Sequence, residues 1–170
     1  MGAPAQKKQF ALDANLLFDL AADQDFAHTL REVFQEKGYL LHVPPTVLQE
    51  VTYAACYKSR EEKLLGMKCL QNIRNWGLQP FDLPPVGHGV TEQFSKMLAQ
   101  KGLLPDSEFN DGLILAETSL VGIPVLVTSD GHLLGIDPQT LAGCFVESDI
   151  SVVQVVHPKL WLAAMVRMYR

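Results

Sequence analysis

The chain has 170 residues, 48% of them hydrophobic, which is enough for one domain with a substantial core and argues against intrinsic disorder. Its 14 Lys and Arg residues against 19 Asp and Glu residues give a formal charge of −5, which argues against binding nucleic acid over the whole surface. The longest apolar runs, GLILA and IPVLV, are far shorter than the ~20 residues that span a bilayer, so we expect no membrane segment.

Strand-like and helix-like patterns alternate along the first half of the chain. We predict a strand over residues 9–12, a helix through residue 20 and a helix over 25–36 that ends at the sequence KG. A short strand follows at 39–43, a helix begins at the sequence PPT after it, and another helix runs over 60–75. This alternation, without an internal repeat, is typical of a parallel α/β sheet.

The second half continues the alternation. The sequence PFDLPPVGHG, residues 80–89, predicts a loop, after which we expect a helix over 90–101 and a connector over 102–109. NDGLILAETSLVG predicts a helix that is buried on most sides, and VLV a buried strand. We expect a last strand at 151–156 and a terminal helix from residue 158 that could serve the core or a dimer interface. Residues 1–170 should form one domain, with residues 1–8 as a loose N-terminal tail.

The cysteines and the start of the chain bear on localisation. Cys56, Cys69 and Cys144 form no C-x-x-C pair, so we interpret them as thiols in a reducing compartment and not as disulfides or zinc ligands. No charged-then-apolar leader precedes Phe10. We therefore expect a cytoplasmic protein.

Three aspartates fall at one predicted edge of the sheet. Asp13 and Asp130 each follow a predicted strand, and open parallel sheets bind ligands outside the carboxyl ends of their strands. Asp111 occupies the first turn of the apolar helix, where the helix dipole stabilises a carboxylate by roughly 0.3–1 kcal/mol. All three side chains are therefore expected at the same edge.

Glu50 joins them from the helix that follows the second strand. It lies on the apolar face of that helix with Val47 and Ala54, an odd place for a solvated glutamate. Thr46 and Gln49 have the spacing of a capping box, so we interpret Gln49 as structural. With the cap already supplied, Glu50 has no evident structural role.

Each aspartate has a structural explanation when it is considered alone. Asp13 could cap its helix, Asp111 could stabilise a helix dipole and Asp130 could belong to the turn SDG. Four clustered carboxylates repel one another, however, and protonation or a cation must relieve that repulsion. Oxygen ligands favour Mg²⁺ or Mn²⁺ over zinc, and one or two such ions can polarise a phosphodiester and generate hydroxide from water. Since no Ser–His or Cys–His pair is comparably placed, we favour metal-dependent hydrolysis.

The order and context of these acids resemble the motifs of the PIN-domain nucleases, the fold of the VapC-type toxins. LDANLLFDL resembles the first motif, an Asp followed two residues later by Asn, and VPPTVLQEV resembles the second with Glu50 as its acid. NDGLILAETSLVGIPVLVTSDGHLLGI resembles the third and fourth together, with Asp111 as the helix acid and Thr128 and Asp130 as a T-x-D element. The resemblance spans residues 10 to about 136.

This resemblance implies a three-layer α/β/α sandwich around a central, mainly parallel sheet and a metal-dependent endoribonuclease that uses one or two Mg²⁺ or Mn²⁺ ions. It implies that four catalytic acids ligate the metal, namely Asp13, Glu50, Asp111 and Asp130. It also implies that Asn15 and Thr128 orient acids or water by hydrogen bonds.

Asp106, just upstream of the Asp111 helix, is a further candidate, for which a turn or cap role is the alternative. We interpret His132 as a surface histidine and Glu108 and Asp137 as surface acids.

Two features depart from a minimal toxin of this family. The chain has extra material around residues 80–102 and after 143, and its net charge is negative although RNA contacts normally require cations. The best available phosphate contacts are the cations of one basic run, together with Lys7 and Lys8, and the run comprises Lys58, Arg60, Lys63, Lys68 and Arg74. A solvated helix face is the alternative interpretation of this run.

Our first hypothesis is a ribonuclease, either the toxin of a toxin–antitoxin pair or an enzyme of RNA processing. Its candidate partners are RNA, an antitoxin protein and a second copy of the chain. The alternative is a non-catalytic PIN-like module that binds nucleic acid or protein. A haloacid-dehalogenase-type phosphatase is disfavoured, because Asn15 stands where such enzymes have a second Asp.

Overall fold

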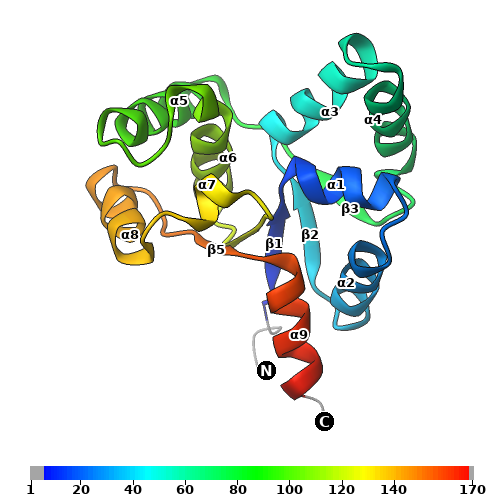
Figure 1. Cartoon of the computed structure of the whole chain (residues 1–170). Helices are drawn as coiled ribbons and strands as arrows, with labels where there is room; N and C mark the ends of the chain where they lie inside the picture. The colour runs from blue at the N-terminus through cyan, green and yellow to red at the C-terminus, as the bar shows by residue number, and fades with distance from the viewer. Residues whose placement is uncertain (1–5, 169–170) are drawn as a thin grey trace.

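The computed structural model describes residues 6–168 and has a five-stranded parallel sheet at its centre (Figure 1). The strands lie in the order β3-β2-β1-β4-β5, and all four neighbouring pairs are parallel. Their bounds are β1 Gln9–Leu12, β2 Leu40–Val43, β3 Leu78–Pro80, β4 Val125–Val127 and β5 Gln154–Val156.

Helices cover both faces of this sheet, which confirms the three-layer α/β/α sandwich (Figure 1). One face carries α1 Ala14–Ala21, α2 Asp25–Glu36, α3 Pro45–Tyr57 and α4 Arg60–Asn72, and the other carries α5 Pro85–Gln100, α6 Phe109–Leu120, α7 Gly131–Leu134 and α8 Pro138–Glu147. The terminal helix α9, Pro158–Met168, packs against α2. Right-handed crossovers explain this division, because the chain first moves outward from β1 to β3 and then returns past β1 to β4 and β5.

That reversal places the chain's switch point between β1 and β4. Leu12 pairs with Val127, so the two strands end at the same level. Asp13 extends the ladder by one residue, since its backbone N–H donates to the Val127 carbonyl over 3.0 Å. Ligands of open α/β sheets bind at such a crevice, which makes this edge the place to look for a site.

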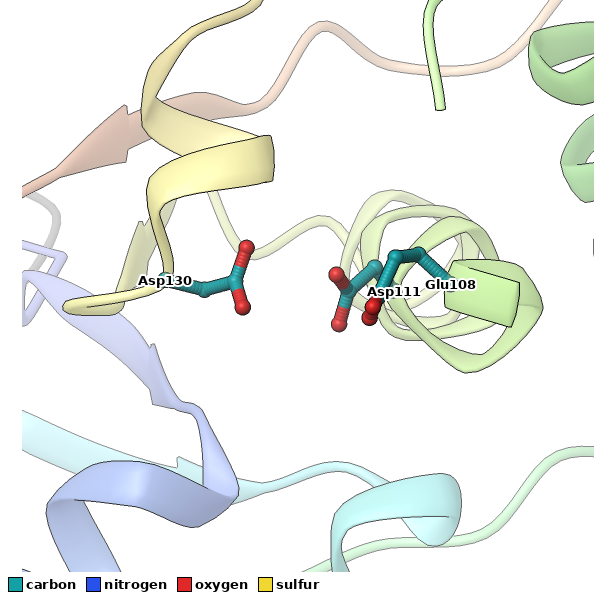
Figure 2. A group of neighbouring side chains, drawn as sticks. All are labelled: Glu108, Asp111 and Asp130. Atoms are coloured by element: carbon teal, nitrogen blue, oxygen red, sulfur yellow. The ribbon is translucent and has the colours of Figure 1, made fainter. Parts of the chain in front are cut away.

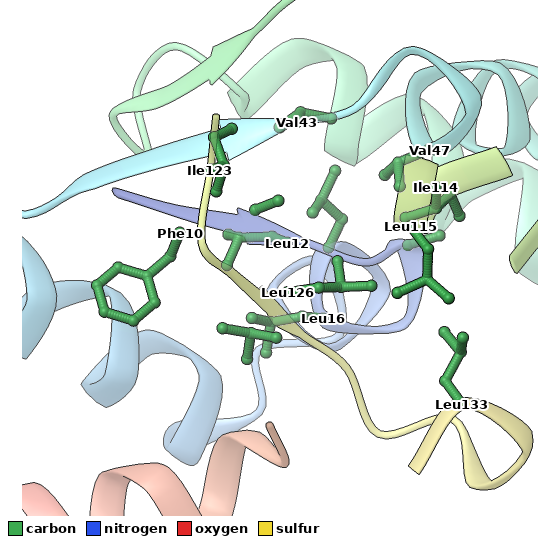
Figure 3. Packing of buried hydrophobic residues seen from close by; sticks show 14 of the residues in the cluster. Phe10, Leu12, Leu16, Val43, Val47, Ile114, Leu115, Ile123, Leu126 and Leu133 are labelled. Carbon is green, nitrogen blue, oxygen red and sulfur yellow. The ribbon is translucent and has the colours of Figure 1, made fainter. Parts of the chain in front are cut away.

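The core lies on both sides of β1 (Figure 3). Phe10 and Leu12 point into it from the strand, and Ile114 and Leu115 reach it from α6. The Phe10 ring lies 4.6 Å from that of Phe34 between centroids. Because β1 is covered on both faces, its last three residues, Phe10, Ala11 and Leu12, are all apolar and buried.

The position of α3 depends on a close approach to α4. A Cβ atom added to Gly66 would lie 2.6 Å from the Ala55 backbone nitrogen and 2.9 Å from the Val51 carbonyl oxygen. Only glycine allows the two helices to approach this closely. The contact fixes the segment of α3 that directly follows Glu50.

Several predicted boundaries are wrong. Residues 80–89 are not one loop, because Pro80 ends β3 and α5 begins at Pro85, five residues before the predicted start. The prolines mislead here, since Pro is well tolerated at the first position of a helix. The strand β3 and the helices α7 and α8 were not predicted, α4 ends at Asn72, and β5 covers only residues 154–156 of the predicted 151–156.

Two further sequence expectations concern the ends of the chain and the membrane. Residues 1–5 of the expected N-terminal tail lie outside the described residues, and the Lys8 carbonyl accepts a hydrogen bond from the Leu40 backbone N–H over 2.9 Å. Within residues 6–168, no helix combines the length and the apolar character that crossing a membrane requires.

Candidate metal centre

Three carboxylates from two elements meet at the switch point (Figure 2). Glu108 directly precedes α6, Asp111 lies in the first turn of α6, and Asp130 directly precedes α7. One oxygen of each lies within 4.8 Å of one oxygen of each of the others. Figure 2 shows the Asp130 carboxylate pointing across the gap toward the other two. We call these three residues the acidic trio.

Asp111 is the buried member of the trio. Its side chain is 8% exposed, and Oδ2 has no hydrogen-bond partner among the described residues. Burial first, and then repulsion by neighbouring carboxylates, raises the pKa of Asp111 to about 8. The repelling groups are Asp13, Asp130, Glu108 and Glu50. A buried oxygen without a partner, surrounded by like charges, fits a divalent cation, and an all-oxygen donor set fits Mg²⁺ or Mn²⁺.

Asp13 lies beside the trio with both oxygens occupied. Oδ1 accepts from the Ala14 backbone N–H over 2.7 Å and so caps α1, as the structural explanation predicts. Oδ2 accepts from the Thr128 hydroxyl over 2.6 Å and from the Asn15 amide over 3.4 Å. Burial raises the pKa of Asp13, while these hydrogen bonds oppose that rise. Its position is therefore fixed by the protein itself.

Thr128 is the centre of the network that holds Asp13. Its Oγ1 also accepts from the Asn15 amide over 3.1 Å and from the Asp130 backbone N–H over 3.0 Å. The Ser129 backbone N–H donates to the Asn15 Oδ1 over 3.3 Å. Asp130 uses its Oδ1 to cap α7, accepting from two backbone N–H groups. Asn15 and Thr128 thus connect the ends of β1 and β4 and orient the acids there.

Glu50 reaches the centre from α3. Its Oε1 accepts from the Asn110 side-chain amide over 3.1 Å, a contact that ties α3 to the start of α6. Burial raises the pKa of Glu50, the Asn110 bond lowers it, and the charge of Asp13 raises it again. Glu50 lies outside the trio but within electrostatic reach of Asp13 and Asp111.

One residue near the trio differs from our expectations. Glu108, which we interpreted as a surface acid, is half-buried and belongs to the trio. Its signal in the sequence was its place three residues before Asp111, immediately before the apolar helix. His132 Nε2 lies 3.9 Å from a Glu108 oxygen. Asp106 is exposed in the short 3₁₀ helix before α6 and does not join the trio.

The predicted capping box is wrong. The helix α3 begins at Pro45, which puts Thr46 inside the helix, so its hydroxyl does not cap it. Thr46 instead donates from its backbone N–H and its hydroxyl to the two oxygens of Glu117, over 3.1 and 2.8 Å. Glu117 is 2% exposed, and burial raises its pKa to about 7 against the effect of these two bonds. It anchors α6 to α3 one turn before Glu50.

The predicted cationic contacts are dispersed. Lys58 pairs with Glu62 over 3.6 Å and Lys68 with Asp23 over 2.7 Å. Arg60, Lys63 and Arg74 are exposed on or just after α4. Lys7 and Lys8 precede β1 and therefore lie at the sheet edge opposite Asp13, so they are not contacts at the acidic trio.

One solved structure shares this fold, and two others are less similar. A chain in the crystal structure of VapBC2 from Rickettsia felis, bound to a DNA fragment from its promoter, is 18% identical, with a TM-score of 0.62 over 88% of this chain and 98% of that chain. Chains in the structures of FitAB bound to the IR36 DNA fragment and of FitAcB from Neisseria gonorrhoeae are 16% and 17% identical, each with a TM-score of 0.47. The match to the FitAB chain covers 88% of this chain and 94% of that chain. The match to the FitAcB chain covers 85% of this chain and 96% of that chain.

Comparison of the sequence with family models identifies the family of the chain. No curated protein matches significantly. The family model described as "PIN domain" matches residues 10–137, which include every carboxylate of the centre described above. The chain therefore belongs to the PIN domain family.

Proposed function

We propose that the chain is a Mg²⁺- or Mn²⁺-dependent endoribonuclease that acts as the toxin of a toxin–antitoxin pair. The observation that carries the proposal is the buried, unpartnered Oδ2 of Asp111 among like charges at the switch point of the sheet. Membership of the PIN domain family supports a nuclease, and the resemblance to VapC-type toxins supports the toxin role.

The residues have distinct roles in this proposal. Asp111, Asp130 and Glu108 would hold the ion, with Asp13 and Glu50 adding negative charge beside them. A bound divalent cation polarises a phosphodiester and lowers the pKa of water. Thr128 and Asn15 keep the Asp13 carboxylate in place by hydrogen bonds.

Cleavage assays test the activity. Wild-type protein should cleave single-stranded or structured RNA with Mg²⁺ or Mn²⁺ and lose this activity in EDTA. Asp111→Asn and Asp13→Asn should abolish cleavage while both variants stay folded, as circular dichroism would show. The matched control is Asp149→Asn, because Asp149 is an exposed carboxylate away from the trio, and its φ of 54° is tolerated by Asn. Full cleavage by both site variants would refute the assignment.

Calorimetry distinguishes the non-catalytic alternative. Titration of Mn²⁺ into the wild type should give a binding isotherm that Asp111→Asn loses. Metal binding without cleavage of any RNA would favour a binding module with a retained acidic centre.

Growth assays test the toxin role. Expression in a bacterial host should arrest growth for the wild type and not for Asp111→Asn. Co-expression of the product of the neighbouring gene should restore growth if that product is the antitoxin. Normal growth on expression of a wild type that cleaves RNA in vitro would favour a role in RNA processing.

A further inference from the structure

Two exposed tyrosines continue the face of α3 that carries Glu50. Tyr53 and Tyr57 are 56% and 75% exposed, and their ring centroids lie 5.2 Å apart with the planes tilted by 40°. They follow Glu50 by three and seven residues, which places all three on one side of the helix. A patch of aromatic surface therefore begins where the acidic centre ends.

A cleft beside the acidic trio is lined by one of the tyrosines and by Glu50. Its volume is about 870 Å³, and Glu50 and Asn110 line it together with Tyr53, Lys58 and Phe18. A second hollow of about 550 Å³ is lined by both tyrosines and by residues of α3 and the segment after β3. Tyr53 and Gln49 line both spaces, so the two hollows adjoin along this part of α3.

The cleft offers one cation, Lys58, beside the carboxylates of Glu50 and Glu62, and its polar groups favour a ligand that forms hydrogen bonds over an apolar peptide. Lys58 brings an ammonium group that is 48% exposed and 3.6 Å from the Glu62 carboxylate. Gln49 and Asn110 supply amides that can donate and accept hydrogen bonds. Flat aromatic faces beside a cation and amides match what unpaired bases and their phosphates require. Glu50 also lines the cleft and accepts a hydrogen bond from Asn110, the residue before Asp111, so a strand bound there would lie next to the acidic trio.

We propose that Tyr53 and Tyr57 form a stacking subsite for unpaired bases of an RNA strand next to the cleaved phosphate, with Lys58 beside its backbone. This inference rests on the proposed function, because it takes RNA as the substrate. A rise of ~1.5 Å per residue puts Tyr53 and Tyr57 about 4.5 and 10 Å beyond Glu50 along α3. The subsite thus serves the first few nucleotides beside the cleaved bond. It is tolerant of sequence and excludes duplex RNA, because paired bases do not offer their faces.

RNA binding tests the subsite in an Asp111→Asn background, which removes cleavage. A short fluorescent single-stranded RNA is titrated against this parent and against variants that also carry Tyr53→Ala or Tyr57→Ala. Each alanine variant should weaken binding roughly 5- to 100-fold, the effect of losing one base stack. Tyr53→Phe and Tyr57→Phe should bind like the parent because the ring remains. Leu160→Ala, which alters an exposed apolar residue on α9, is the matched control.

The outcomes separate this inference from the proposed function. Unchanged RNA affinity in both alanine variants overturns the subsite, as does equal binding of a duplex. Loss of antitoxin binding with unchanged RNA affinity also overturns it, and assigns the tyrosines to a protein partner. If the wild type cleaves RNA and the KM is unchanged in Tyr53→Ala and Tyr57→Ala, the subsite is refuted and the proposed nuclease activity stands. Tyrosine-dependent RNA binding by a wild type that cleaves nothing supports the subsite and removes the nuclease.

Discussion

The buried carboxylate of Glu117 should make the stability of the fold depend on pH. Burial raises its pKa from the ordinary value of 4.5 to about 7, so the folded state holds a proton that the unfolded state has already released. The stabilising contribution is fully present below pH 4.5 and is lost as the pH rises through about 7. Glu117→Gln removes this titration while keeping the size of the side chain.

The size of the effect follows from the two pKa values. Linkage gives a total of at most ~3.4 kcal/mol, of which about 2 kcal/mol falls between about pH 5.5 and pH 8.5. Glu117 is 2% exposed, so solvent screening reduces this figure little. The wild type should therefore lose about 2 kcal/mol more stability over this interval than Glu117→Gln does.

Urea unfolding in EDTA at several pH values measures the difference. Asp111 also titrates in this range, but it is present in both proteins and cancels in the comparison. Added Mg²⁺ should suppress the contribution of Asp111 and leave that of Glu117, which lies outside the acidic trio. If the free energy of unfolding changes with pH equally in the wild type and in Glu117→Gln, the raised pKa of Glu117 is refuted.

Three further predictions concern the centre and the packing. Because the pKa of Asp111 is raised to about 8, Mn²⁺ should raise the thermal unfolding midpoint more at pH 8.5 than at pH 5.5, and an equal rise in Asp111→Asn would contradict this assignment. Gly66→Ala should cost about 1–3 kcal/mol in urea unfolding, because the new Cβ would lie 2.6 Å from the Ala55 nitrogen. Phe34→Ala should lower the free energy of unfolding by about 3–5 kcal/mol in the same assay, because Phe34 is fully buried. Leu160→Ala, at an exposed position, should change it by no more than about 0.5 kcal/mol. Similar losses in both variants would contradict the burial of Phe34 in the core.

The sequence predicts those elements whose pattern results from burial. Both faces of the sheet are covered at β1 and β4, and residues 10–12 of β1 and all of β4 are apolar, so the place and type of both strands could be predicted. β3 could not, because it has three residues, only Leu78 is buried, and Pro80 ends it at the sheet edge. α8 had local signals in Asp137 as N-cap and Pro138 at the first turn, but the interpretation of Asp137 as a surface acid left them unused.

The candidate site was predictable where it depends on strand ends and not where it depends on tertiary contacts. Asp13 follows β1 directly, and Asp130 closely follows β4, so topology alone brings them to one edge. Glu117 pairs with Thr46 across 71 positions of sequence, and no local pattern reveals such a contact. The capping box failed for another reason, because α3 begins at Pro45 and Thr46 therefore lies inside the helix, where its hydroxyl donates to Glu117.

The hydrogen bonds of the centre also distinguish its acids from one another. Both oxygens of Asp13 accept bonds from the protein, whereas Oδ2 of Asp111 is buried with no partner among the described residues. A buried charge without a hydrogen-bond partner costs more free energy than a hydrogen-bonded one. An ion that binds here therefore relieves a greater cost at Asp111 than at Asp13. We therefore propose that metal affinity depends mainly on Asp111. Asp13, held by Thr128 and Asn15, mainly sets the negative potential and the geometry of the edge where the two strands end.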